Sequence, residues 1–173
     1  GALISFEAVQ KYPDIFSGLI CLSPAFASRM KFPPLDYLKF VIYLLVKPRN
    51  QFFMPFKAEE CTRDPGYQQI LNDDVREHRF ATVRLLSETL NAQLKALLFK
   101  NKVSIPVLFQ SAGIDKLVDP SASEKVFAKI NVKDKRLIHY PEMLHALSID
   151  IGREKVFEDI LSWIKTINKQ KGK

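Results

Sequence analysis

Asp115 and His145, both in the C-terminal half of the sequence, are of the types and in the order that acid–base chemistry at a hydroxyl would need. Asp115 follows the predicted strand 105–110 in a Gly-x-Asp turn, and His145 lies five residues past the next predicted strand, which ends at Tyr140. In open parallel sheets, functional residues gather just beyond the carboxyl ends of the strands. A carboxylate that orients an imidazole, and an imidazole that takes a proton from a hydroxyl, are the last two members of a Ser–Asp–His triad. The order therefore predicts Asp115 as the acid and His145 as the general base.

Each residue also has a purely structural interpretation. Asp115 could end its strand by bonding the backbone of the turn, as Asp often does. Asp119 could cap the next helix, and His145 could be a structural histidine that lies beneath a loop with its ring nitrogens hydrogen-bonded. The other two histidines fit the base less well, because His139 falls within a predicted strand and His78 within a helical region. The catalytic interpretation gains weight only from the two positions taken together with the strand order.

The elements that would position these residues form an α/β pattern. A nearly continuous apolar run bounded by turn residues predicts a strand at 17–22. Residues 105–110 and 135–140 are also predicted as strands, the second ended by Pro141. Apolar spacing or capping residues predict helices at 1–10, 121–130 and 153–167. In the second of these helices, Ser121 is expected as the N-cap, with Glu124 completing a capping box. Alternating strands and helices imply a parallel sheet flanked by helices.

The region between residues 26 and 100 looks helical and shows no clear strands. Its apolar segment 40–46 has seven residues, far fewer than the about 20 that a membrane span needs. An aromatic, loop-like stretch follows at 52–56. Residues 80–99 carry apolar side chains at steps of three and four, which predicts an amphipathic helix.

Composition and charge narrow the class of protein. The 173 residues are 47% hydrophobic and include 13 Phe, which excludes disorder as the main state. A net charge of +7 favours acidic partners such as nucleic acid or anionic lipid. Part of the excess is a lysine-rich tail at 165–173, which is more typical of a solvated helix end than of a binding patch. Cys21 and Cys61 lack metal-ligand spacing and are expected to be reduced thiols in a reducing compartment.

The segments around the two candidates resemble one branch of the α/β-hydrolases. Residues 105–120 look like the segment around the catalytic Asp of the monoacylglycerol lipase and lysophospholipase branch, which makes Asp115 the triad acid. Residues 140–147 resemble the family's His segment and make His145 the general base. The second segment departs from the pattern at Met143 and in lacking the acidic residue that commonly follows the His by a few positions. The resemblance implies an α/β-hydrolase fold with a helical cap insertion.

The beginning of the chain resembles the family as well. Gly1-Ala2 looks like the end of the Gly-x-Ser-x-Gly-Gly-Ala motif of the nucleophile elbow, which would place the nucleophilic Ser three residues before Gly1. The resemblance then implies core segments at 1–25 and 101–173, a helical cap at 26–100, and early strands and an elbow outside this chain. We expect the chain alone to be inactive and poorly stable, since the strand at 17–22 would keep an unpaired edge.

The resemblance also implies substrate-binding positions. These are Leu117, Val118 and Ala146 beside the triad members, and Phe40 and Leu44 in the cap. An apolar run such as 40–46 is more often core than binding surface. On a cap, however, it could line an acyl-chain tunnel or touch lipid, and Lys39, Lys47 and Arg49 would suit an anionic interface.

The sequence therefore predicts a serine hydrolase that cleaves carboxylic esters of monoacylglycerols or lysophospholipids through an acyl-enzyme. No metal or organic cofactor is implied. The expected partners are a lipid ester and the missing N-terminal half, with no nucleic acid, in a cytoplasmic protein that can contact a membrane peripherally. Two alternatives stay open: a thioesterase or peptidase of the same fold, since fold does not fix substrate, and a non-catalytic basic α/β module that binds nucleic acid or an anionic membrane.

Overall fold

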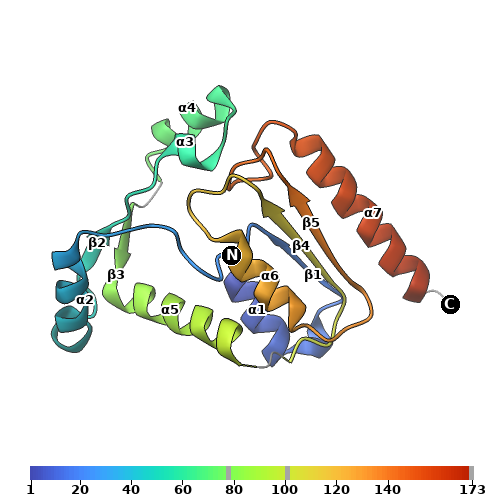
Figure 1. Cartoon of the computed structure of the whole chain (residues 1–173), viewed down its shortest axis with the longest axis horizontal. Coiled ribbons are helices and arrows are strands. Elements are labelled where there is room, and N and C mark those ends of the chain that lie inside the picture. The colour runs from blue at the N-terminus through green and yellow to red at the C-terminus, as the bar shows by residue number, and fades with distance from the viewer. Residues whose placement is uncertain (77–78, 100–101, 172–173) are drawn as a thin grey trace.

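A three-stranded parallel sheet forms the centre of the molecule (Figure 1). The computed structural model describes residues 1–76, 79–99 and 102–171. The strands lie in the order β1 (Leu19–Leu22), β4 (Val107–Ala112) and β5 (Lys135–Tyr140). Leu22 pairs with Gln110, and Ala112 pairs with Tyr140, so the carboxyl ends of the strands meet at one edge of the sheet.

Helices cover both faces of this sheet, as the α/β pattern predicts. On one face, α1 (Ala2–Lys11) and α6 (Pro120–Ala128) pack on Val107 and Phe109 of β4. On the other face, α7 (Arg153–Lys171) packs Trp163 and Ile167 against Leu108. Because successive residues of a strand point to opposite faces, β4 contributes to both layers. All six of its residues are buried, whereas β1 and β5 keep partly exposed positions at the two edges of the sheet.

Aromatic rings fill the α1 side of the core. Phe6 from α1, Phe26 from the segment after β1 and Phe109 from β4 are all 0% exposed. The ring centroids of Phe6 and Phe26 lie 5.0 Å apart, and those of Phe26 and Phe109 lie 5.7 Å apart. A short 3-10 turn, η1 (Pro13–Ile15), joins α1 to β1. The strand and helix positions predicted for this part of the chain are therefore confirmed to within a few residues.

The region between β1 and β4 contains both helices and strands. Its elements are α2 (Pro34–Val46), β2 (Gln51–Phe53), α3 (Ala58–Cys61), α4 (Pro65–Asp73), β3 (Phe80–Thr82) and α5 (Val83–Leu98). The prediction of a region without strands is wrong, because β2 and β3 pair antiparallel with Phe52 opposite Ala81. Three residues are too few to show an alternating pattern, and the partner strand is distant in the sequence.

Two predicted helix starts also need correction. Phe80 belongs to β3, and Thr82 caps α5 by accepting a hydrogen bond from the backbone N–H of Leu85 at 3.2 Å. Helix α6 begins after Asp119, whose carboxylate accepts from the backbone N–H of Ser121 at 3.1 Å. The capping box expected between Ser121 and Glu124 is therefore wrong, because Asp119 already occupies the N-cap and Pro120 the first helical position.

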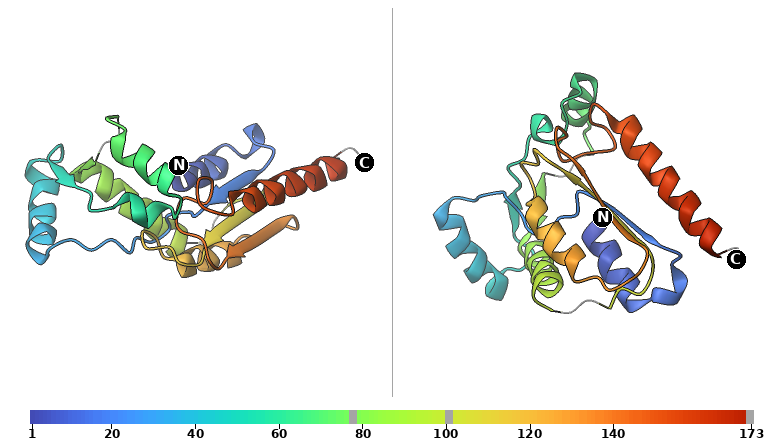
Figure 2. Two further views of the ribbon diagram at one scale, coloured as in Figure 1. Left: turned by 90° about the horizontal axis from the view of Figure 1, so that it is seen from above. Right: turned by 45° about the vertical axis from the view of Figure 1, so that its right-hand side comes forward.

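Of the middle elements, α2 and the β2–β3 pair extend away from the sheet on the side opposite α7, whereas α3 and α4 lie near the beginning of α7 (Figure 2). Helix α5 links them to the core, because Ala92 and Ala96 belong to the same buried cluster as Phe6 and Phe109. Among the described residues, no helix has both the length and the apolar character needed to cross a bilayer. The cap boundaries at 26 and 100 stay a prediction; His78, placed in the same region, lies outside the described residues.

Candidate active site

Asp115 and His145, the two predicted catalytic residues, are in direct contact. Asp115 lies in the turn after β4 and His145 in the loop after β5, and the distance from His145 Nδ1 to Asp115 Oδ2 is 2.8 Å. The Asp115 side chain is 1% exposed, and that of His145 is 28% exposed. The other oxygen, Oδ1, accepts the backbone N–H groups of Leu117 and Val118, both at 2.9 Å. An ionised carboxylate only accepts, so Nδ1–H donates to it and Nε2 is left to take a proton.

A close approach of two loops makes this contact possible. The N–H of Gly113 donates to the carbonyl of Tyr140 at 2.8 Å, and that of Ile114 donates to the carbonyl of Met143 at 3.2 Å. A Cβ atom added at Gly113 would lie 2.3 Å from the carbonyl oxygen of Pro141. Only glycine fits between the two backbones at this point. The loop after β4 that holds Asp115 (the Asp loop) and the loop after β5 that holds His145 (the His loop) are therefore joined by backbone hydrogen bonds as well as by the contact of these two side chains.

Arg29 also holds the Asp loop through hydrogen bonds. Its guanidinium donates to the carbonyl of Asp115 at 2.7 Å and to the carboxylate of Asp119 at 3.3 Å. The N–H of Arg29 also donates to the carbonyl of Leu117 at 2.9 Å. The pKa of Asp119 is lowered, chiefly by the hydrogen bond from the Ser121 hydroxyl and further by the charge of Arg29. Arg29 could not be predicted from the sequence, because 86 residues separate it from Asp115 and no local spacing links them.

An acidic residue, Asp150, follows His145 by five positions. It is 0% exposed and accepts the backbone N–H of Leu144 at 2.8 Å. The expectation that the His segment lacks such an acid is therefore wrong. The contact folds the loop back on itself and holds Leu144, the residue before His145, through its N–H.

A cavity of about 690 Å³ opens beside His145. Phe40, Leu117 and Val118 line it, as do His145 itself and Cys61. Most of its other lining residues are apolar side chains of the middle region, including Met30, Phe32, Phe52, Met54, Phe56, Leu86 and Leu90. A concave, mainly apolar site with a few polar groups at one place is the usual form of a small-molecule site.

Two of the predicted substrate-binding residues lie elsewhere. Leu44 is on α2, is 38% exposed, and is not among the residues that line the cavity. Ala146 follows His145 but does not line the cavity either, and its N–H donates to the carbonyl of Cys61 at 2.8 Å. The structure thus brings Phe40, Leu117 and Val118 to His145 and leaves Leu44 and Ala146 outside the cavity.

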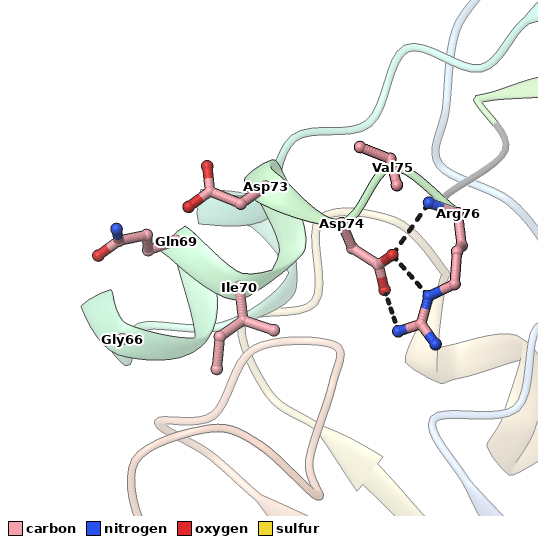
Figure 3. A pocket seen from close by; sticks show the side chains of 7 residues that line it. All are labelled: Gly66, Gln69, Ile70, Asp73, Asp74, Val75 and Arg76. Atoms are coloured by element: carbon pink, nitrogen blue, oxygen red, sulfur yellow. Dashed lines mark hydrogen bonds and ion pairs between the residues drawn. The ribbon is translucent and has the colours of Figure 1, made fainter.

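A second hollow, of about 440 Å³, lies along α4 and the residues that follow it (Figure 3). Asp74 and Arg76 form its most polar wall, where the guanidinium donates to the carboxylate at 2.8 and 2.9 Å. None of its lining residues lines the first cavity. Within the described ranges, no group of three or more His, Cys, Asp or Glu side chains could hold a metal ion.

Comparison with known proteins extends these observations. The sequence profile of the family described as serine aminopeptidase, S33, matches residues 1–152. A putative monoglyceride lipase of Schizosaccharomyces pombe is 23% identical over 152 residues, which are 86% of this chain and 40% of that protein.

Solved structures agree on the fold. The crystal structure of Paleococcus ferrophilus monoacylglycerol lipase has a TM-score of 0.88 at 20% identity, over 96% of this chain and 65% of that one. A soluble variant of Saccharomyces cerevisiae monoglyceride lipase, in complex with a substrate analog, has a TM-score of 0.86 at 19% identity, over 96% and 59%. The chain spans less than two thirds of each of these relatives. With this sheet, these loops and this sequence match, the chain belongs to the serine aminopeptidase, S33, family of α/β-hydrolases.

Proposed function

We propose that this chain carries the acid and the base of a serine hydrolase that cleaves carboxylic esters of lipids. The observation that carries the proposal is the 2.8 Å contact between His145 and a buried Asp115, at an apolar cavity of about 690 Å³. The nucleophilic Ser is proposed to lie upstream of Gly1, in the other half of the same protein. Asp115 and His145 are then the second and third members of its triad.

The proposed reaction passes through an acyl-enzyme. Nε2 of His145 takes the proton of the Ser hydroxyl as its oxygen attacks the ester carbonyl, and the resulting imidazolium is stabilised by Asp115. The imidazolium then gives that proton to the departing alcohol oxygen as the ester bond breaks. In the second half, His145 takes a proton from water, the hydroxide oxygen attacks the acyl carbon, and the proton returns to the Ser oxygen. Asp115 stays ionised throughout.

The shape and lining of the cavity support a monoacylglycerol or lysophospholipid as substrate. Phe40, Leu117 and Val118 line the same cavity as His145, so they are proposed to contact the acyl chain next to the reacting carbonyl. Each CH₂ group removed from water contributes about 0.8 kcal/mol, so a long acyl chain would be held mainly by these apolar walls. We therefore expect the enzyme to prefer esters with long acyl chains over those with short ones.

The test uses the protein with its upstream residues and p-nitrophenyl esters of short and long chains. We expect His145→Ala to lower kcat by about 10³-fold or more, since loss of a triad member removes the activation of the nucleophile. His139→Ala is the matched control, because His139 is exposed on β5 and bonds Ser111 rather than Asp115. Full activity of His145→Ala would reject the proposed base.

A peptidase is the second candidate, because the matching family is described as serine aminopeptidase. The same His–Asp pair can serve the cleavage of an amide. Hydrolysis of aminoacyl p-nitroanilides, with no hydrolysis of long-chain esters, would favour it.

We also propose that the protein contacts membrane lipid through α2. No residue of this helix is buried, and Leu35, Leu38, Val41 and Leu45 are between 58% and 81% exposed. The helix lies at the outer end of the molecule, away from α7 (Figure 1). An exposed apolar helix with basic residues near its end is suited to an anionic lipid interface.

A further inference from the structure

The backbone N–H groups of both neighbours of His145, Leu144 and Ala146, donate to acceptors elsewhere in the chain. The N–H of Leu144 donates to Asp150 Oδ2 at 2.8 Å. The N–H of Ala146 donates to the carbonyl of Cys61 at 2.8 Å. The residues on both sides of His145 are thus held through their N–H groups, and the contact with Asp115 holds the ring.

Asp150 is bonded on both carboxylate oxygens. Oδ1 accepts from the backbone N–H of Arg63 at 2.7 Å and lies 3.3 Å from the Thr62 hydroxyl. Oδ2 accepts from Arg63 Nε at 3.1 Å in addition to the N–H of Leu144. A second nitrogen of the same guanidinium, Nη2, donates to the carbonyl of Ile151 at 2.6 Å. Arg63 therefore holds both the carboxylate and the backbone that follows it.

The charge state of Asp150 agrees with this arrangement. Burial alone raises the pKa of a carboxyl group, and Asp150 is 0% exposed. The backbone N–H groups of Arg63, Leu144 and Ile151, together with the Arg63 guanidinium, outweigh burial and lower the pKa of Asp150. The group is an ionised acceptor at neutral pH, which is what strong bonds to these donors require.

The groups that bond Asp150 and the N–H of Ala146 come from the middle region of the chain. Cys61, Thr62 and Arg63 form the junction between α3 and α4, which lies beside the loop from β5 to α7 (Figure 1). A second ion pair joins the same elements, since Arg153 Nη1 lies 3.0 Å from Asp64 Oδ2. The middle region is therefore attached to the His loop at several consecutive residues.

We infer that Asp150 and Arg63 are positioning residues, which act through the backbone of His145 to aim its imidazole at the nucleophile. The inference rests on the proposed function, in which His145 is the base. A misplacement of about 1 Å in a reacting group can lower a rate by about 10²-fold. Loss of the Asp150–Arg63 pair should therefore lower kcat far more than it changes KM.

The test compares two buried aspartates of the intact enzyme. Asp150→Asn is expected to lower kcat by about 10²-fold with KM changed by less than about threefold. Asp159→Asn is the matched control, because Asp159 is also buried and bonds Tyr140 and Lys155 on the α7 side. Thermal unfolding of both variants shows whether their loss of stability is similar.

A variant with unchanged net charge distinguishes the loss of His145 positioning from an effect of the changed charge. Asp150→Asn combined with Arg63→Gln leaves the net charge unchanged and removes the ion pair, so we expect kcat to stay low. If Asp150→Asn does not fold, Thr62→Val is the milder substitution. It removes one hydroxyl bond to Asp150 and one to the carbonyl of Ile149, and should lower kcat by about 3- to 10-fold.

Different results would reject the positioning role and the proposed base. Wild-type kcat in Asp150→Asn, with an inactive His145→Ala, would overturn the positioning role alone. So would recovery of kcat in the variant with unchanged net charge, because the effect would then be one of charge. Full activity of His145→Ala would overturn both the positioning role and the proposed base.

Discussion

A single glycine lets the acid and the base meet. Gly113 packs against the backbone of Pro141 where the loops after β4 and β5 run together, and a Cβ would come within 2.3 Å of a carbonyl oxygen there. Backbone atoms cannot turn aside as a side chain can. The separation of Asp115 and His145 therefore depends on a residue that takes no part in the chemistry.

We predict that Gly113→Ala lowers the free energy of unfolding by at least about 1–3 kcal/mol, because the methyl group forces the two backbones apart. Activity should fall as well, since the same movement separates Asp115 from His145. Denaturant unfolding and kcat of the intact enzyme measure the two effects. Gly66→Ala, where the added atom would meet only the Asp64 side chain at 3.3 Å, should be nearly neutral.

The two cysteines should react very differently with alkylating agents. Burial raises the pKa of the Cys21 thiol to about 12, so almost none of it is thiolate at pH 8. Cys61 is only partly buried and lines the cavity. We predict that iodoacetamide at pH 8 labels Cys61 before Cys21 in the native protein, measured by peptide mass spectrometry. In denaturant both should label, and equal native rates would contradict the burial of Cys21.

Among the elements, α2 carries the clearest prediction. Leu38→Asp combined with Leu45→Asp should lower binding to anionic phospholipid vesicles by at least about tenfold, because fully burying a leucine contributes about 1.5–3 kcal/mol. Co-sedimentation measures the bound fraction. Ile4→Asp is the control, since Ile4 is 75% exposed on α1 rather than on α2. Equal loss in both variants would point to general charge repulsion instead of contact by α2.

The elements also show how far the sequence could predict the structure. Parallel strands such as β1 and β4 were predictable because each is a mainly apolar run between turn residues. Strands β2 and β3 were not, because their stability comes from pairing with each other rather than from a local pattern. Asp115 and His145 could be identified because each lies within five residues of the carboxyl end of a strand. Arg29 and Arg63 could not, because their partners lie more than 80 residues away.

For the whole molecule, the lowered pKa values of Asp150 and Asp159 set the acid limit of stability. A carboxyl group with a lowered pKa stabilises the fold fully above the pKa of an unfolded Asp, about 3.9. That contribution is lost as the pH falls through the lowered pKa values. We predict a free energy of unfolding that is nearly flat from about pH 7 to 5 and falls steeply below about pH 4. Urea titrations over this range test it, and a constant value down to pH 3 would contradict it.

The ion pair between Arg63 and Asp150 has a consequence for chimeras made from this protein and its relatives. The two residues are 87 positions apart, so a crossover placed at the end of the middle region separates them. In a chimera that takes residues 26–100 from a relative, the residue at position 63 and its neighbours come from that relative, whereas Asp150 comes from this chain. We expect such chimeras to bind substrate through the cavity-lining residues of the relative but to have a low kcat, unless the loop that holds His145 is exchanged as well. Substrate specificity and catalysis would then have to be transferred together.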